Sequence, residues 1–232
     1  MPLKITDFSN QILTQISFEL QEDQNLIILG SNGVGKTTLA KVLCGITQSN
    51  NVMINDIDSS KISGKKRAKL INYLPPKLEI FDEFMSVGAF LKLGYFNHHT
   101  TIDKVLKILE ISHLKEETCH SLSSGESQLL LIASSLLHNA DFTIFDEPTA
   151  NLDPKKIQML FSLLKNKQHL KSKILITHNL DFAYKLGFDI LFLKNGSIKF
   201  HGPSQLFFKQ ENLDMLYEKS VQKIDHNIVV NL

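Results

Sequence analysis

Gly30-Ser31-Asn32-Gly33-Val34-Gly35-Lys36-Thr37-Thr38 is the stretch that decides the fold of this 232-residue chain. It matches the phosphate-binding pattern G-x-x-x-x-G-K-[ST] at every fixed position. An apolar run, residues 26–29, precedes it, and a helix-compatible run, residues 39–44, follows it. Strand, glycine loop and helix are the setting that this pattern needs. The sequence therefore predicts a P-loop that binds a nucleoside triphosphate.

The residue types of the loop explain this chemistry. Glycines allow the backbone to wrap around phosphates, with N–H groups at the positive end of a helix dipole. Lys36 places a compact cation against the β- and γ-phosphates, and the Thr37 hydroxyl suits Mg²⁺. A chance glycine-rich turn would meet the pattern in roughly one such sequence in a hundred, and the flanking elements lower that further. The predicted nucleotide-binding residues of the loop are Gly30, Ser31, Asn32, Gly33, Val34, Gly35, Lys36, Thr37 and Thr38.

Bulk composition excludes several classes of protein. Net charge is +1, and Arg67 is the single arginine among 25 basic residues, which argues against a nucleic-acid binder. Cys44 and Cys119 have neither disulfide-framework nor metal-ligand spacing, and two free thiols fit a reducing cytosol. No apolar run approaches the 18 residues of a membrane helix, and the N-terminus lacks a signal-peptide core. Any membrane role is therefore expected through a partner.

The order of the apolar runs predicts an α/β fold, a P-loop NTPase with a mainly parallel, doubly wound sheet and N-terminal antiparallel strands. Asn195-Gly196 predicts a hairpin turn. Helical periodicity between about residues 81 and 137 predicts an inserted all-helical subdomain, with N-caps at Ser86 and Thr101. We expect one domain, 1–232, with its core in 1–76 and 138–232 and the insertion in 77–137. The predicted strands are 3–8, 16–20, 26–29, 52–54, 71–74, 142–145, 174–176, 190–193 and 197–201.

Phe145-Asp146-Glu147-Pro148 ends one hydrophobic strand with two adjacent carboxylates. A P-loop ATPase needs an acidic group at the tip of a strand to face the metal bound to its threonine, and Asp146 is the candidate. Glu147 is the candidate general base that orients and deprotonates an attacking water. The alternative, an acidic surface turn, is disfavoured by the apolar strand before the pair and by the P-loop elsewhere in the chain.

With these residues in place, the chain resembles the ATP-binding cassette (ABC) ATPases. Leu122-Ser123-Ser124-Gly125-Glu126 is similar to the signature motif of that family, LSGGQ or LSGGE. Residues 148–153, Pro-Thr-Ala-Asn-Leu-Asp, resemble its D-loop, and Thr177-His178 resembles its switch histidine. The order and the spacing of the motifs match over nearly the whole chain.

The resemblance implies that ATP is held between the P-loop of one subunit and the signature loop of another. Ser123, Ser124, Gly125 and Glu126 would then meet the γ-phosphate at a helix N-terminus. His178 would contact the γ-phosphate and, with Glu147 and Lys36, form the catalytic set. Asp153 would span the dimer interface. Phe8 is the candidate for stacking on adenine, and a core phenylalanine is the equal alternative.

Weaker signals resemble importers of iron-siderophore, haem and cobalamin. They are Leu74-Pro75, Met85-Ser86-Val87, Leu93-Gly94-Tyr95 and the tail from Gly202 to Tyr217. The resemblance implies an ATPase that uses ATP and Mg²⁺, with a second cassette as partner, expected to be an identical copy. It also implies two further partners, an integral membrane permease and, indirectly, an external solute-binding protein, and no nucleic acid. The resemblance further implies a cytoplasmic protein bound to the inner face of the membrane through the permease. The alternatives are an export ATPase or a weakly active regulatory cassette and, less favoured, a non-transport cassette acting on nucleic acid or ribosomes.

Several positions depart from the family pattern. Pro76 stands where the family has the glutamine of its Q-loop, and a proline has neither the amide nor a backbone donor. Ser124 replaces the middle glycine of the signature and needs a negative φ. Leu129 replaces the usual arginine after Gln128. None of these changes removes phosphate binding, Mg²⁺ or the general base, so the sequence predicts a working ATPase that is either slow or differently coupled.

Overall fold

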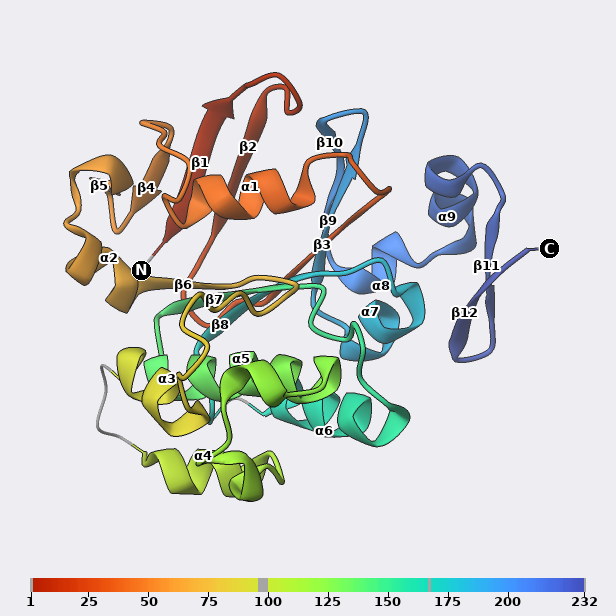
Figure 1. The fold of residues 1–232 in the computed structure, drawn as a ribbon. Coiled ribbons are helices and arrows are strands. Elements are labelled where there is room, and N and C mark those ends of the chain that lie inside the picture. The colour runs from red at the N-terminus through yellow and green to blue at the C-terminus, as the bar shows by residue number, and fades with distance from the viewer. Residues whose placement is uncertain (1, 96–99, 167, 232) are drawn as a thin grey trace. The chain divides into compact units, whose positions relative to one another are not determined.

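The computed structural model describes residues 2–95, 100–166 and 168–231 (Figure 1). The chain divides into two compact units. The first unit comprises Met1–Ile62 and Ile174–Leu232, and the second comprises Ser63–Lys173. Each unit has its own strands and helices and is described by itself below. The predicted boundaries at 76 and 138 stay a prediction.

An antiparallel sheet opens the first unit. It runs in the order β2 (Ile16–Leu20), β1 (Leu3–Phe8), β4 (Val52–Ile54) and β5 (Ile57–Asp58) (Figure 1). Along β2 buried and exposed residues alternate strictly, which is typical of a strand with one face against a core. The predicted bounds of the first, second and fourth strands are confirmed, whereas the two-residue β5 is too short to produce a periodic signal.

Parallel strands carry the P-loop in the first unit. β3 (Leu26–Gly30) pairs in parallel with β9 (Asp189–Lys194) and with residues 174–176 of β8 (Ser172–Ile176). Residues 26–29 are fully buried, because both faces of such a strand are covered. β10 (Ser197–Gly202) returns antiparallel to β9, and Asn195 and Gly196 have the positive φ angles of the predicted hairpin turn, 52° and 71°.

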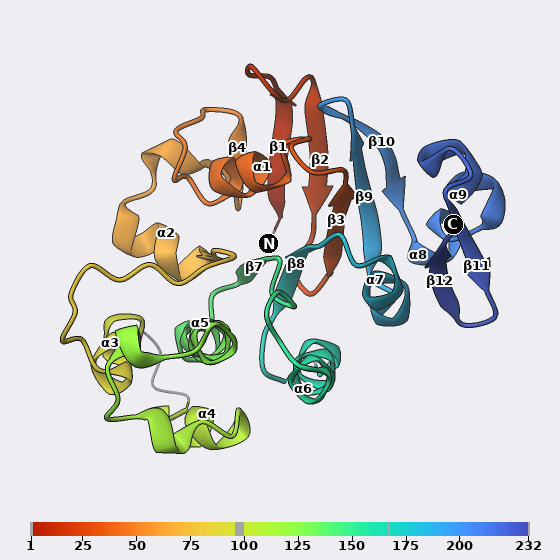
Figure 2. The ribbon, with the colours of Figure 1, turned by 45° about the vertical axis from the view of Figure 1, so that its right-hand side comes forward.

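The remaining elements of the first unit are helices and a terminal hairpin. The helices are α1 (Lys36–Leu43), η1 (Ser59–Lys61), α7 (Leu180–Leu186), α8 (Ser204–Phe207) and α9 (Gln210–Tyr217). β11 (Val221–Ile224) and β12 (Asn227–Val230) form the hairpin, which lies beside α9 in Figures 1 and 2. The ring of Phe207 packs on those of Phe192 and Phe200, with centroids 5.7 and 5.2 Å away, and so attaches the tail to β9 and β10.

The second unit combines a parallel strand pair with helices. β6 (Ile71–Leu74) and β7 (Phe142–Asp146) pair in parallel. The longest helix, α5, is buried along most of its length. Ser86 and Thr101 accept hydrogen bonds from the backbone N–H groups three residues on, which confirms both predicted N-caps. The helices are α2 (Gly64–Leu70), α3 (Val87–Leu93), α4 (Ile102–Ile108), η2 (Ser112–Leu114), η3 (Cys119–Ser121), α5 (Ser124–His138) and α6 (Pro154–Lys165).

Parallel strands, an N-terminal antiparallel sheet and the strand–loop–helix of the P-loop together confirm the predicted P-loop α/β fold. Within the described residues, no helix combines the length and the apolar character that crossing a bilayer requires.

Candidate nucleotide-binding site

The P-loop joins β3 to α1 in the first unit, and its glycines adopt backbone angles that other residues avoid. Gly33 and Gly35 have φ angles of 77° and 107°. A Cβ on Gly35 would also lie 2.6 Å from Cδ2 of Leu13, so both the backbone angle and the contact with Leu13 exclude a side chain at this position. Gly35 is the N-cap of α1 and provides no side-chain cap. The N-terminus of α1 therefore keeps the amide donors that an anion needs.

Lys36 is folded back over its own loop. Its Nζ donates hydrogen bonds to the carbonyl oxygens of Gly30, at 2.8 Å, and Ser31, at 3.0 Å, and the residue is only 8% exposed. Neutral carbonyls compensate a buried ammonium less than anionic oxygens do. The ammonium is thus held at the loop by contacts that a phosphate chain can replace with stronger ones.

A cavity of about 300 Å³ lies beside the P-loop within the first unit. Gly30, Ser31 and Asn32 line one part of it, and Thr177 and His178 line another. The structure thus brings the predicted switch histidine to the rim of the loop, where its side chain is exposed. Burial raises the pKa of the phenol of Tyr217, which also lines the cavity, so that group stays neutral. The volume is at the lower end of the range for ligand pockets, about 300 to 1,000 Å³.

Phe8, the predicted adenine-stacking residue, is buried. Phe8 is 7% exposed at the end of β1, so little of its ring is open to a base. Ile12, which we did not select from the sequence, is 48% exposed, and its Cγ2 lies 3.0 Å from the position of a Cβ on Gly35. Asn10 Oδ1 accepts hydrogen bonds from the N–H groups of Ile12 and Leu13 and shapes this turn. An apolar residue after Ser9-Asn10-Gln11 was the signal that could have identified Ile12.

In the second unit the two acidic candidates end β7. Asp146 is 2% exposed, and its Oδ2 accepts a hydrogen bond of 2.9 Å from the hydroxyl of Tyr73. Glu147 follows with a φ of 50°, a left-handed angle that costs a non-glycine residue about 1 to 3 kcal/mol. Its carbonyl accepts a hydrogen bond from Ala150 N–H. The chain therefore turns directly after the strand, at Glu147.

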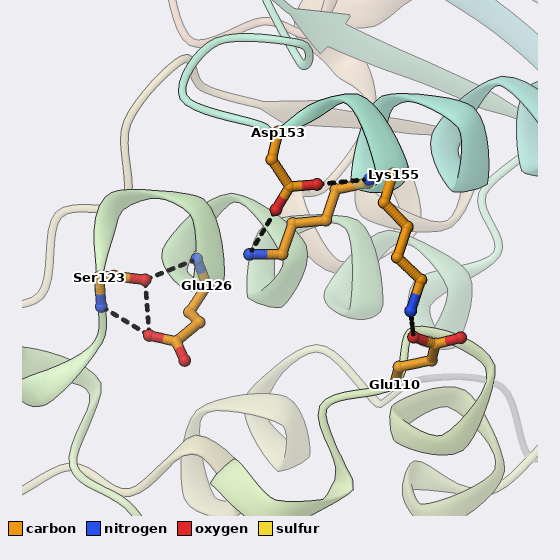
Figure 3. Close-up of polar contacts among 6 residues, drawn as sticks. Glu110, Ser123, Glu126, Asp153 and Lys155 are labelled. Atoms are coloured by element: carbon orange, nitrogen blue, oxygen red, sulfur yellow. Dashed lines mark hydrogen bonds and ion pairs between the residues drawn. The ribbon is translucent and has the colours of Figure 1, made fainter.

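The signature-like loop begins α5 with a complete capping box (Figure 3). Ser123 Oγ accepts a hydrogen bond from the Glu126 N–H, and Glu126 Oε2 accepts from the N–H and the hydroxyl of Ser123, at 2.8 and 2.6 Å. The pKa of the Glu126 carboxyl is lowered, chiefly by the hydrogen bond from the Ser123 hydroxyl and then by the one from the Ser123 N–H. Ser123 and Ser124 are exposed, and Ser124 begins the helix without a positive φ.

The D-loop-like segment contacts the signature-like loop inside the same unit. A Cβ on Gly125 would lie 3.0 Å from the carbonyl oxygen of Asn151 and 3.4 Å from Lys156 Nζ. Asp153 is the N-cap of α6, and its Oδ1 accepts a hydrogen bond from the Lys156 N–H (Figure 3). This hydrogen bond lowers the pKa of the Asp153 carboxyl. Asp153 Oδ2 also forms an ion pair with Lys156 Nζ at 3.4 Å. Lys155 at the same helix start pairs with Glu110 at 2.5 Å. These contacts attach α6 to the signature-like loop and, through Glu110, to the end of α4.

Comparisons with known proteins agree with these motifs. The family model described as ABC transporter matches residues 13–150. A putative ABC transporter ATP-binding protein of Pyrococcus horikoshii is 32% identical over 95% of this chain and 88% of its own length. The zinc import ATP-binding protein ZnuC of Buchnera aphidicola is 30% identical over 95% of this chain and 92% of its own length. By contrast, the chain spans about half, 51%, of a putative ABC transporter ATP-binding protein of Clostridium tetani.

Among solved structures, the chain is similar to cbiO1 of Clostridium perfringens, described as part of the ABC transporter complex cbiONQ. The TM-score is 0.74 at 25% identity, over 92% of this chain and 94% of that one. Fold, motifs and relatives therefore agree, and the chain belongs to the ABC transporter family as one of its ATP-binding ATPase cassettes.

Proposed function

We propose that this chain is the ATP-hydrolysing subunit of an ABC importer. The observation that carries the proposal is the P-loop, with the left-handed Gly35, an α1 N-terminus without a side-chain cap, and Lys36 held on two replaceable carbonyl contacts. The nine loop residues bind the phosphates of ATP, and Ile12 is a second candidate beside Phe8 for contact with adenine. Two copies close around two ATP molecules, each completed by Ser123, Ser124, Gly125, Glu126 and Asp153 of the other copy.

The residues present fit Mg²⁺. Asp146 is a buried, hydrogen-bonded carboxylate and Thr37 carries a hydroxyl, and this small cation prefers such hard oxygen ligands, completed by phosphate oxygens and waters. No group of three His, Cys, Asp or Glu side chains in the described parts of the chain is placed to hold a metal by itself. We propose Thr37 and Asp146 as ligands of an ion that arrives with ATP, where it would neutralise charge on the phosphates.

Glu147 and His178 complete the proposed catalytic set. Glu147 accepts the proton of the attacking water, and the exposed imidazole of His178 holds the γ-phosphate end of the nucleotide. Glu147→Gln keeps the shape and removes the base, so we expect hydrolysis to fall at least 100-fold, within the range for loss of a general base. ATP should still bind and should hold the variant as a dimer in size-exclusion chromatography. Hydrolysis at the parental rate would overturn the assignment of the base.

A surface of the second unit is suited to the permease. Phe81 and Phe84 are 97% and 87% exposed, in the loop between β6 and α3. Beside them lies a hollow of about 580 Å³, lined by Lys77, Glu79, Ile80, Phe81, Cys119 and His120 among others. Exposed aromatic side chains next to a hollow are typical of protein interaction sites. We propose that this surface receives the membrane subunit.

The permease test uses co-expression of this chain with a candidate membrane subunit. Phe81→Ser together with Phe84→Ser should abolish co-purification and leave basal ATP hydrolysis unchanged. A matched control is Leu93→Ser with Leu206→Ser, which removes two other exposed apolar side chains. Retention of the complex by the Phe81/Phe84 variant would show that the permease docks elsewhere.

For the cargo we propose a transition metal or its chelate. The sequence resembles importers of iron-siderophore, haem and cobalamin, and one relative is named for zinc import. Cells lacking the gene should lose uptake of one of these cargoes, measured separately with zinc-65, a ferric siderophore, haem and cobalamin. Normal uptake of all four would overturn the cargo class and leave the ATPase assignment intact.

Pro76 favours one second candidate, a weakly active regulatory cassette. An exposed proline at this position cannot provide the amide contact of the family glutamine. Pro76→Gln tests the role of this position: an unchanged rate of hydrolysis and of transport would show that it has no role in coupling and would remove the support for the second candidate.

A further inference from the structure

Tyr73 makes a contact that neither the motifs nor the proposed catalytic set explain. It lies in β6 of the second unit, opposite Ile144 in the parallel register with β7. Its hydroxyl reaches two residues further along the neighbouring strand and donates a 2.9 Å hydrogen bond to Asp146 Oδ2. The two residues are 73 positions apart in the chain. The contact therefore exists only because β6 and β7 pair in this register.

The acceptor is the carboxylate proposed to hold Mg²⁺, and it is 2% exposed. A hydrogen bond from a hydroxyl to a buried carboxylate restricts rotation of the carboxylate and fixes the direction of its oxygens. Partners of this kind orient metal-binding carboxylates, and their loss typically costs 10- to 100-fold in metal affinity or activity. Tyr73 is therefore placed to orient Asp146 without touching the ion itself.

Tyr73 also connects Asp146 to the loop with the exposed phenylalanines. Strand β6 ends at Leu74 and continues directly into Pro75-Pro76, whose rings fix φ and stiffen the start of the loop. Pro76 has no side-chain donor with which to reach the ion. The Tyr73 hydroxyl is two residues before this loop and is already bound to Asp146.

We propose that Tyr73 is a positioning residue: it fixes the Asp146 carboxylate for the divalent ion and makes its orientation depend on strand β6 and the loop that follows. This inference rests on the proposed function of Asp146.

The test replaces the hydroxyl alone, with Tyr73→Phe, in the Glu147→Gln background that keeps ATP intact. Mn²⁺ bound to the protein–ATP complex is titrated by electron paramagnetic resonance. We expect the Mn²⁺ affinity to fall about 10-fold, the lower end of the range for such partners. ATP affinity in EDTA should not change, because the phosphates are bound elsewhere.

Tyr95→Phe is the matched control. The Tyr95 hydroxyl donates to the carbonyl of Thr100 in the same unit, so this variant loses the same group without touching Asp146. Its Mn²⁺ affinity should equal that of the Glu147→Gln parent. In an Asp146→Asn background, Tyr73→Phe should have no further effect, because its partner carboxylate is gone.

Three results would overturn the inference: an unchanged Mn²⁺ affinity, an equal loss of ATP affinity in EDTA, or failure of Tyr73→Phe to fold, since the last two indicate a purely structural role. If Asp146→Asn itself leaves Mn²⁺ affinity unchanged, the proposed metal ligand is wrong instead. The failure of the inference is therefore distinguishable from the failure of the proposed function.

Discussion

Helices α1 and α5 both begin at predicted phosphate-binding motifs, yet their N-termini differ in how they are capped. α1 starts at Gly35 without a side-chain cap, and Lys36 beside it is bound to carbonyl oxygens. α5 starts at Ser124, after the N-cap Ser123: the Glu126 carboxylate accepts from the Ser123 N–H, and the Ser123 hydroxyl accepts from the Glu126 N–H. The N-terminus of α1 therefore has no side-chain cap, whereas two amides at the start of α5 are already bonded to side chains of the capping box.

This difference suggests an order of binding. A nucleotide meets prepared donors at α1, so the P-loop can bind ATP in a single subunit. At α5 an arriving phosphate must share or displace the Ser123–Glu126 contacts, and opening a cap costs about 0.5 to 2 kcal/mol. Such a cost can be recovered when a whole dimer interface forms, so we expect the signature-like loop to act late.

The largest expected effect comes from removing the cation at α1. Lys36→Ala should weaken ATP binding about 100-fold, because a charge-assisted contact to phosphate contributes roughly 1.5 to 3 kcal/mol. Fluorescent-nucleotide titration measures the affinity. The control is Lys41→Ala, which removes an exposed lysine from the last turn of the same helix. An unchanged affinity for ATP would show that the P-loop before α1 does not bind the phosphates through Lys36.

Ser123→Ala tests whether α5 acts later than α1. We expect turnover to fall about tenfold, as for loss of one donor worth roughly 1.4 kcal/mol, while ATP affinity of the monomer stays within twofold. Steady-state hydrolysis and nucleotide titration give the two values. Ser162→Ala, an exposed serine of α6 whose hydroxyl donates to the Gln158 carbonyl, is the control. Equal losses in both measurements would contradict the proposed order.

Glu126→Gln tests whether the internal carboxylate opposes the arriving phosphate. The amide keeps an acceptor oxygen for the cap and removes a like charge. Turnover should rise about fivefold, since two unit charges about 4 Å apart in water repel by about 1 kcal/mol. Glu110→Gln removes an exposed carboxylate from the same unit and should change turnover less. A slower Glu126→Gln variant would show that the carboxylate assists the reaction.

The smallest effect concerns stability and pH. The hydrogen bonds of the capping box lower the pKa of the folded Glu126 carboxyl below its ordinary value of 4.5. The charged cap therefore contributes stability above about pH 4.5, and this contribution is lost as the pH falls through the folded pKa. The parent should be more stable than Glu126→Gln at pH 6 by about 0.3 to 1 kcal/mol, the value of a charge at a helix N-terminus. Urea unfolding at pH 6 and pH 3 measures the gap, which should shrink at pH 3.

Features encoded by neighbouring residues could be predicted from the sequence. The P-loop, the N-caps at Ser86 and Thr101, the Asn195-Gly196 turn and the bounds of residues 3–8 and 16–20 each depend on spacings of a few residues. Helical periodicity predicts a helix from about Glu126 to Leu137, whereas α5 begins two residues earlier, at Ser124, because the Ser123 cap begins the helix ahead of its apolar face. The predicted strand 174–176 is short by the same amount, since β8 begins at Ser172.

The sequence by itself determined the family and the identity of the candidate residues, because phosphate chemistry demands particular residue types at short, constant spacings. The tertiary structure decided their contacts: the Tyr73 hydroxyl on Asp146, Ile12 beside Gly35, and Gly125 against Asn151. These contacts join residues that are far apart in the chain. They depend on strand register and on the path of loops, which no local spacing encodes, and so only the packed chain could reveal them.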